Sequence, residues 1–233
     1  MSIAEKLTAI AENEEKIYDK GRNDEWADFW DSFHASAYNQ NRSGKGLYGG
    51  RGWNDKIFKP KHSFAPVNAE NMFRDSNIRD LAGILKKQGI VFDFKDSSYF
   101  DYFAYSSMIT HFPPIDFRKA GPKGYVFGYC QRAVTIDKVI YKADGTTSFS
   151  NDFVECTALE NLVVEGVIGK NGFDVRYSTK LTHDSLMSII NALKDYSTDT
   201  SGTTYKVTLG SDNIAKLTEE EINIIKNKGW TYA

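Results

Sequence analysis

The segment SNDFVECTALENLVVEGVIG, residues 150–169, contains a pattern that recurs along the chain. Phe153 is followed at offsets of three, six and nine by Cys156, Leu159 and Leu162, and then by an apolar run. Earlier copies begin with a phenylalanine, and a degenerate later copy begins with a valine: Phe73, Phe103, Phe127 and Val175. In the first copy, the second and third offsets are each shorter by one residue. The chain therefore contains four clear repeats and a weak fifth.

The leading residues of successive repeats are 30, 24, 26 and 22 positions apart. This period is typical of leucine-rich and related solenoid repeats, in which a short turn or helix and a short strand form one unit. Such units bury their apolar faces only by stacking, so residues at equal offsets form columns. One predicted column holds only small side chains, Ser76, Ser106, Cys130 and Cys156. We expect both cysteines to be free, buried and structurally equivalent.

We predict an α/β repeat fold in four regions, with a coiled-coil helix first and a helical cap last. The regions are an N-terminal helical segment for oligomerisation and anchoring (1–36), a linker with an N-terminal cap (37–66), leucine-rich repeats (67–181) and a C-terminal cap (182–233).

The first predicted helix, residues 2–21, has a narrow apolar stripe at alternating spacings of four and three, interrupted at Glu14, formed by Ile3, Leu7, Ile10 and Ile17. Such a stripe is typical of a coiled-coil seam. Leucine at position a with isoleucine at position d favours trimers or tetramers. A single amphipathic helix packed on its own domain is the alternative. The next segment has more apolar area than a coiled-coil seam needs. We expect it to anchor the N-terminal helix to the rest of the domain or to a partner chain, through Trp26, Phe29, Trp30 and Phe33.

The last region has clear start and stop signals for helices. Thr182 precedes a periodic apolar face that includes Leu186 and Ile189, and residues 200–210 alternate as a strand. Thr218 and Glu221 have the spacing of a capping box, with Gly229 beyond the helix end. We expect this region to close the open end of the repeats.

Composition excludes several classes of partner. The chain has 29 basic and 31 acidic residues, which gives no reason to expect nucleic acid or an anionic membrane as a partner. No apolar stretch is long enough for a spanning helix, so no membrane insertion is expected. The N-terminus lacks the features of an export signal.

Tyrosines are candidates for binding a partner. The chain has 13 of them, and five lie near predicted turns, where rigid amphipathic rings can stack on sugars or pack on protein: Tyr99, Tyr102, Tyr105, Tyr125 and Tyr129. The alternative is that they are half-buried strand residues.

Motifs for catalysis or cofactor binding are weak. Gly44, Gly46 and Gly49 spell G-x-G-x-x-G, but neither a buried strand precedes them nor a helix follows. The four histidines, His34, His62, His111 and His183, have no second ligand at metal-binding spacing. Five acids could pair for work on a glycan, Asp93, Asp96, Asp101, Asp116 and Asp137, but acids at such turns usually bond backbone N–H groups. We therefore predict no enzyme, no catalytic residues, no cofactor and no metal.

Several segments resemble a family of phage and prophage proteins of Firmicutes with BspA-like leucine-rich repeats behind a short N-terminal helix. AEKLTAIAENEEKIYDKG (4–21) is similar to the opening helix, and GGRGWNDKIFKPK (49–61) to the entry into the repeats. NAENMFRDSNIRDL (68–81) resembles the first repeat, and LTHDSLMSIINAL (181–193) the start of the cap. Pro113, Pro114 and Lys138 depart from the repeat pattern.

The resemblance implies a structural virion protein of the tail or baseplate, assembled in the host cytoplasm. The implied partners are further copies of the chain, as a trimer or higher oligomer through the N-terminal helix, and other tail or baseplate proteins, together with a host cell-envelope polymer. A bacterial BspA-like surface adhesin that binds protein or glycan is the main alternative, and an enzyme acting on cell-wall glycan is a distant third.

Overall fold

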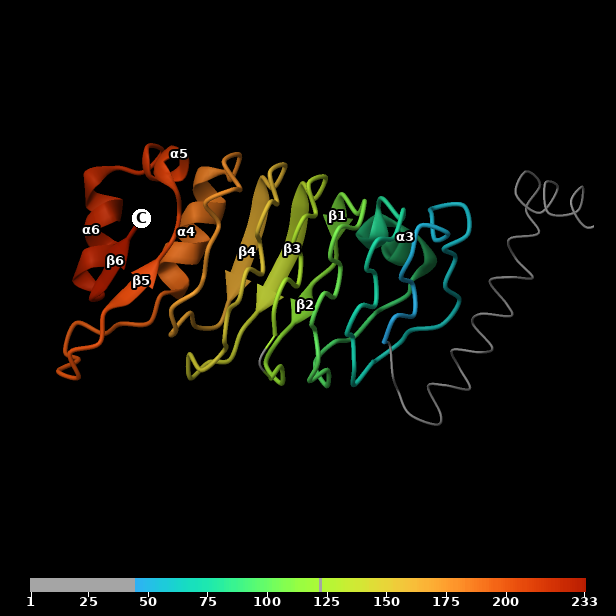
Figure 1. The fold of residues 1–233 in the computed structure, drawn as a ribbon, viewed down its shortest axis with the longest axis horizontal. Helices are drawn as coiled ribbons and strands as arrows, with labels where there is room; N and C mark the ends of the chain where they lie inside the picture. The colour runs from blue at the N-terminus through green and yellow to red at the C-terminus, as the bar shows by residue number, and fades with distance from the viewer. Residues whose placement is uncertain (1–44, 122) are drawn as a thin grey trace, which may run out of the picture.

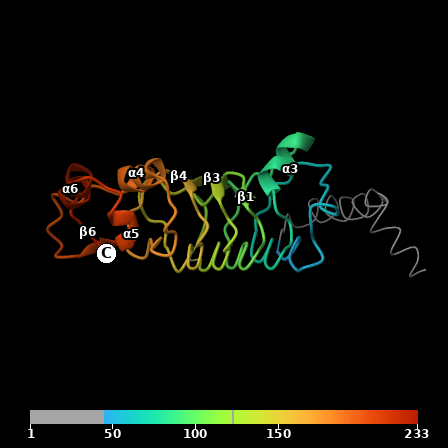
Figure 2. The ribbon, with the colours of Figure 1, turned by 90° about the horizontal axis from the view of Figure 1, so that it is seen from above.

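The computed structural model describes residues 45–121 and 123–233, which form a row of stacked coils with helices at both ends (Figure 1). Viewed from above, the coils lie side by side with their bends aligned along one edge (Figure 2). The predicted seam and the predicted anchoring segment lie outside the described residues.

A small parallel sheet runs through the middle of the row. Strand β3 (Thr135–Ile140) pairs along one edge with β1 (His111–Phe112) and β2 (Ile115–Asp116), and along the other with β4 (Asn161–Glu165). Further parallel bridges continue the pattern on both sides, among them Asp80 with His111 and Ile168 with Leu193. The predicted mixed α/β class is therefore confirmed, with a small parallel sheet as its β component.

The departures noted in the sequence have local structural effects. Pro113 and Pro114 separate β1 from β2, because proline cannot donate a backbone hydrogen bond to the ladder. Lys138 lies where the pairing of β3 with β4 shifts register, between Ile136 and Val139. This irregularity is a β-bulge, which absorbs the extra residue without breaking the strand.

Left-handed backbone conformations mark equivalent positions in the coils. They occur in pairs, at Asn71 and Asp75, Tyr102 and Ser106, Tyr125 and Tyr129, and Asn151 and Glu155. Aligning these pairs places Phe73, Phe127 and Phe153 together, as predicted, but it pairs them with Ala104 and not with Phe103. Backbone hydrogen bonds agree, since Phe73 donates to Phe103, Ala104 to Val126, and Phe127 to Asp152.

The prediction for the second repeat was therefore wrong by one residue. Ser106 is exposed, and the buried member of the small-residue column is Ser107, whose hydroxyl lies 3.5 Å from the Cys130 sulfur. The aromatic core is still continuous, because the Phe103 ring lies 5.4 Å from Phe73 and 6.2 Å from Phe127. Phe103 thus fills space that the short side chain of Ala104 leaves.

Both cysteines are free and buried at equivalent positions, as expected. The Cys130 thiol donates to the Ala104 carbonyl at 2.9 Å, and the Cys156 thiol donates to the Phe127 carbonyl at 3.0 Å. Each thiol therefore ties its coil to the preceding one. Burial raises the pKa of Cys130 to about 11, which keeps the thiol protonated at neutral pH.

Helices close both sides of the sheet. α3 (Leu81–Gln88), which the repeat pattern did not predict, lies on the N-terminal side. On the other side, α4 (His183–Ala192) begins after Thr182 as predicted. The Ser185 and Ser188 hydroxyls of α4 accept hydrogen bonds from the backbone N–H groups of Leu162 and Val164 in β4. Helix α4 thus provides hydrogen-bond acceptors for backbone N–H groups of an edge strand, which would otherwise be free to pair with another chain.

The C-terminal part packs beyond α4. It contains β5 (Tyr205–Val207), α5 (Ser211–Ile214), α6 (Glu219–Asn227) and β6 (Trp230–Tyr232), and β5 pairs in parallel with β6. The predicted capping box of Thr218 and Glu221 is present at the start of α6. The Lys228 ammonium donates to the carbonyls of Ile190, Asn191 and Leu193, which caps the end of α4.

Candidate functional site

Four tyrosines from two neighbouring coils form one group of rings, which we call the tyrosine cluster: Tyr102, Tyr105, Tyr125 and Tyr129. The rings of Tyr102 and Tyr125 are stacked with centroids 5.5 Å apart. Tyr105 lies edge-on to Tyr102 at 5.3 Å and tilted against Tyr129 at 5.3 Å. Tyr129 is 42% exposed and the other three are half-buried, so the cluster is both packed and accessible.

The backbone holds the cluster in a conformation that tyrosine seldom adopts. Tyr102, Tyr125 and Tyr129 have φ values of 53°, 52° and 60°. Asparagine and aspartate, found at some equivalent positions of the flanking coils, tolerate this region better than a bulky aromatic residue does. A left-handed residue of this kind costs about 1–2 kcal/mol. Tyrosine at three such positions is therefore more easily explained by its side chain than by the needs of the turn.

Two residues that sequence reasoning missed complete the cluster. The Arg74 guanidinium lies 5.1 Å from the ring centroid of Tyr102 and 5.5 Å from that of Tyr105. Gly128 lies between rings, where an added Cβ would come within 3.2 Å of Tyr125 and 3.3 Å of Tyr105. Arg74, Tyr105 and Gly128 occupy the same position in successive coils, so a correct register for the second repeat would have placed them together.

Tyr99, the fifth predicted tyrosine, lies apart. Its side chain is 55% exposed, and its carbonyl accepts the Ala69 N–H in an earlier part of the coil. Among the described residues it makes no ring contact with the cluster. We therefore leave Tyr99 out of the candidate site.

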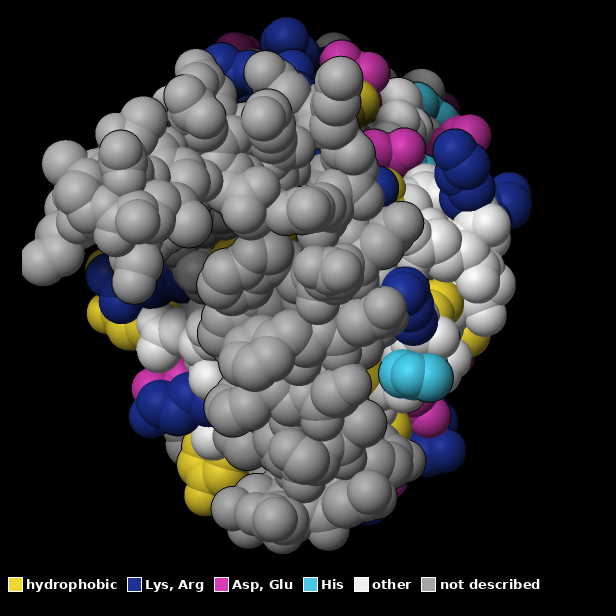
Figure 3. Space-filling model, turned by 90° about the vertical axis from the view of Figure 1, so that its right-hand side faces the viewer, with side chains coloured by type: hydrophobic (Ala, Val, Ile, Leu, Met, Phe, Trp, Pro, Cys, Tyr) yellow, Lys and Arg dark blue, Asp and Glu magenta, His cyan; other side chains and the backbone are white. Residues whose placement is uncertain are grey.

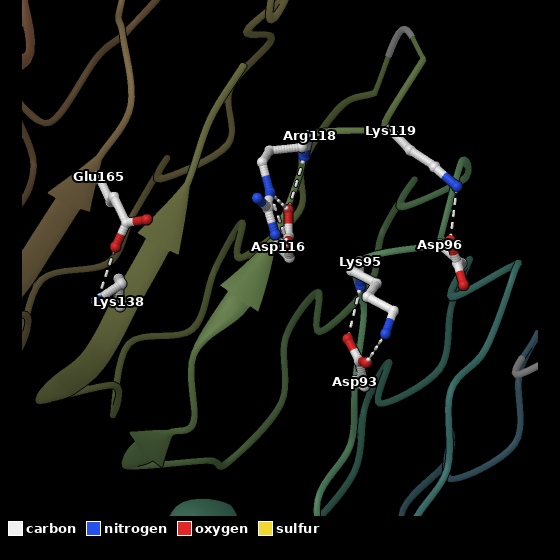
Figure 4. Close-up of polar contacts among 8 residues, drawn as sticks. All are labelled: Asp93, Lys95, Asp96, Asp116, Arg118, Lys119, Lys138 and Glu165. Atoms are coloured by element: carbon white, nitrogen blue, oxygen red, sulfur yellow. Dashed lines mark hydrogen bonds and ion pairs between the residues drawn. The ribbon is translucent and has the colours of Figure 1, made fainter. Parts of the chain in front are cut away.

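The five acids considered for glycan chemistry each have a cationic or N–H partner. Asp93 pairs with Lys95, Asp116 with Arg118, and Asp96 with Lys119 of the next coil (Figure 4). Asp101 accepts the Gly124 N–H, and Asp137 bonds His111 at 2.6 Å. The hydrogen bond to Asp116 raises the pKa of the Arg118 guanidinium. Each of these carboxylates therefore has a partner within its own coil or in a neighbouring one.

A separate hollow of about 520 Å³ lies among the coils nearest the N-terminal end of the described chain. Its lining combines one carboxylate with three cations and an apolar side chain: Asn54, Asp55, Lys56, Asn77, Arg79, Met108 and Arg132. Basic and acidic side chains alternate over the visible part of this end of the molecule (Figure 3). The Asp55 carboxylate accepts the Arg79 N–H at 2.7 Å, so it supports the local turn.

Within residues 45–121 and 123–233, no group of three or more His, Cys, Asp or Glu side chains could hold a metal ion. None of the helices in the same part of the chain has the length and apolar character needed to cross a bilayer.

Comparisons of the chain with protein family models, with curated proteins and with solved structures found no match.

Proposed function

We propose that the chain is a non-enzymatic structural component of a phage tail or baseplate, and that its tyrosine cluster binds a polymer of the host surface. The observation that carries the binding proposal is the cluster itself, in which four rings from two coils are packed together at strained turns. Rigid, partly exposed rings bind sugars and proteins at low entropic cost, because little side-chain freedom is lost.

We further propose that the stacked coils are a BspA-like leucine-rich-repeat solenoid. This is supported by the parallel bridges between successive coils, by the column of Phe73, Phe103, Phe127 and Phe153, and by the pairs of left-handed residues. Residues 182–233 would then be the C-terminal cap, since α4 covers the last strand of the sheet and α6 packs near it.

The chemistry of the cluster favours a glycan with anionic groups. Ring faces stack on the apolar faces of sugars, and Arg74 at one end supplies a cation. Arg74 is exposed and also contacts Asp75 at 3.5 Å, an ion pair that solvent weakens. A host cell-envelope polymer that carries both sugars and phosphate or carboxylate groups fits this combination.

Oligomerisation remains a proposal from the sequence. Ile3, Leu7, Ile10 and Ile17 would join chains as a trimer or higher oligomer, and Trp26, Phe29, Trp30 and Phe33 would attach the oligomer to other tail proteins. Ile10→Asp combined with Ile17→Asp should reduce the mass measured by light scattering, because buried charges in a seam are costly. An unchanged mass would remove this part of the proposal.

The binding proposal is tested with purified protein and cell-envelope preparations of candidate hosts. Tyr102→Ala combined with Tyr105→Ala should weaken binding by about 1 kcal/mol per ring. Tyr177→Ala is a control, because Tyr177 is an exposed tyrosine, 40% exposed against 42% for Tyr129, that lies outside the cluster. Equal binding by all three proteins would contradict the proposed role of the cluster.

A bacterial BspA-like adhesin would give the same binding result, so a second experiment separates the two. Antibodies against this chain should label the tails of purified particles if it is a virion protein assembled in the host cytoplasm. Labelling of the bacterial surface without labelling of particles would favour the adhesin.

A further inference from the structure

Lys123 and Asp152 form a buried pair between two neighbouring coils. Their side chains are 1% and 3% exposed, and the Lys123 amine contacts the Asp152 Oδ2 atom. This differs from the ion pairs of Figure 4, in which at least one partner is well exposed. The pair therefore lacks the water that stabilises separate charges.

The surroundings of the pair are apolar. The Lys123 nitrogen lies 5.1 Å from the ring centroids of both Phe117 and Phe149. The second carboxyl oxygen of Asp152, Oδ1, is buried without a hydrogen-bond partner. The positions equivalent to Asp152 in the earlier coils hold buried apolar side chains, Met72, Phe103 and Val126. An apolar residue here would stabilise the stack at least as well as an ion pair, so stability alone does not explain the pair.

Burial also changes the protonation of the pair. It raises the pKa of the Asp152 carboxyl, and the opposing charge of Lys123 offsets only part of this shift. An apolar site disfavours two separate buried charges, and amide formation requires the amine and the carboxyl group to be uncharged when they react.

We propose that Lys123 and Asp152 form an intramolecular isopeptide bond. The Lys123 nitrogen attacks the Asp152 carboxyl carbon, an N–C bond forms, and the bond from that carbon to its hydroxyl oxygen breaks. The amine proton leaves with the hydroxyl group, so the only product released is one water molecule, and no oxidant or other reactant is needed. The two groups are held together in a closed, apolar site, which supplies the proximity that an uncatalysed amide bond requires.

The bond would join two coils that otherwise interact through hydrogen bonds and packing. It would close a loop between residues that are 29 positions apart, and such a link restricts the unfolded chain as a disulfide does. It would also resist reduction, unlike a disulfide. This inference does not depend on the proposed binding function, because the pair lies in the core.

Mass spectrometry of the denatured protein tests the proposal directly. We expect the intact mass to be lower than that of the linear sequence by one water molecule. Proteolysis should release a branched peptide that joins the segment around Lys123 to the segment around Asp152. Lys123→Gln should restore the full mass, whereas Lys138→Gln, which removes an exposed ion pair with Glu165, should keep the deficit.

The result that would overturn the proposal is a wild-type protein with the full linear mass and separate peptides for the two segments. Such a protein would contain an ion pair only. A deficit of one water without the branched peptide would also contradict it, because the loss would then come from another site. Both measurements use the wild-type chain, so they do not depend on the folding of a variant.

Discussion

Tyr102 and Tyr125 belong to different coils, yet their ring planes are 1° from parallel and their centroids lie 5.5 Å apart. Both residues have a left-handed backbone, with φ values of 53° and 52°. Because equivalent turns repeat the same backbone conformation, equal side chains in them project in the same direction. Stacking of coils therefore produces stacking of rings, and the surface that we propose as a binding site forms without any movement of the chain.

The space left by Gly128 should matter for binding more than for stability. Gly128→Ala would place a methyl group within 3.3 Å of two cluster rings, so the rings must move apart. We expect a loss of about 1 kcal/mol in binding, roughly fivefold, with a cooperative thermal transition preserved. Near-UV circular dichroism would report the ring movement. Gly52→Ala is the control, because a Cβ there meets nothing within 4 Å.

The buried thiol of Cys130 should make the fold sensitive to high pH. Its pKa is raised from 9.0 to about 11 on folding, because burial disfavours the thiolate. Above about pH 9 the unfolded chain loses this proton while the folded chain keeps it, so the free energy of unfolding falls as pH rises towards 11. The loss is on the order of 2 kcal/mol. Cys130→Ser should flatten this part of the curve, measured by urea unfolding at several pH values.

A serine is tolerated in the same column at Ser107, so Cys130→Ser is a conservative change. Native thiol labelling supplies a second readout. Both cysteines should react slowly in the folded protein and rapidly after denaturation, since both are buried. Rapid labelling of the native protein would contradict the register of the coils.

The contact between α4 and β4 should protect the sheet edge. Ser185→Ala leaves the Leu162 N–H and the Glu160 carbonyl without their side-chain partner. We expect destabilisation by about 1–3 kcal/mol in chemical unfolding and a greater tendency to aggregate. Asn191→Ala changes an exposed position of the same helix and should be nearly neutral. Equal effects of the two changes would show that the hydroxyl of Ser185 is unimportant.

The aromatic column should dominate the stability of the stack. Phe127 contacts rings from both neighbouring coils, at 6.2 Å from Phe103 and 5.5 Å from Phe153. Phe127→Ala should cost about 3–5 kcal/mol, because the cavity lies between coils that cannot close it independently. Val163→Ala on β4, where the side chain is 47% exposed, should cost less than about 0.5 kcal/mol. Urea unfolding of both variants measures the difference.

Periodicity in the sequence was sufficient to predict a mixed α/β fold with an aromatic core, because packing between coils requires one large residue per turn. It failed by one residue in the second repeat, where Ala104 and Ser107 occupy the positions that the pattern gave to their neighbours Phe103 and Ser106. Backbone conformation decides between such neighbours, and composition does not. Helix α3 was also missed, since its first residue, Leu81, had been assigned to the first repeat.

The candidate site was predictable only in part. Tyrosines near turns are visible in the sequence, but Arg74 and Gly128 join them through the stacking of coils, which places residues far apart in the chain beside one another. The Lys123–Asp152 pair was not predicted for a related reason. A buried charge interrupts the apolar pattern, and its partner can be identified only when the neighbouring coil is placed.

The most direct test of the tyrosine cluster is NMR of the tyrosine ring protons during titration with a candidate envelope polymer. We expect chemical shifts to change at the four rings of the cluster, with little change at Tyr99 and Tyr177, which lie outside it. A polymer that binds the protein while leaving the four cluster rings unchanged would contradict the proposed site.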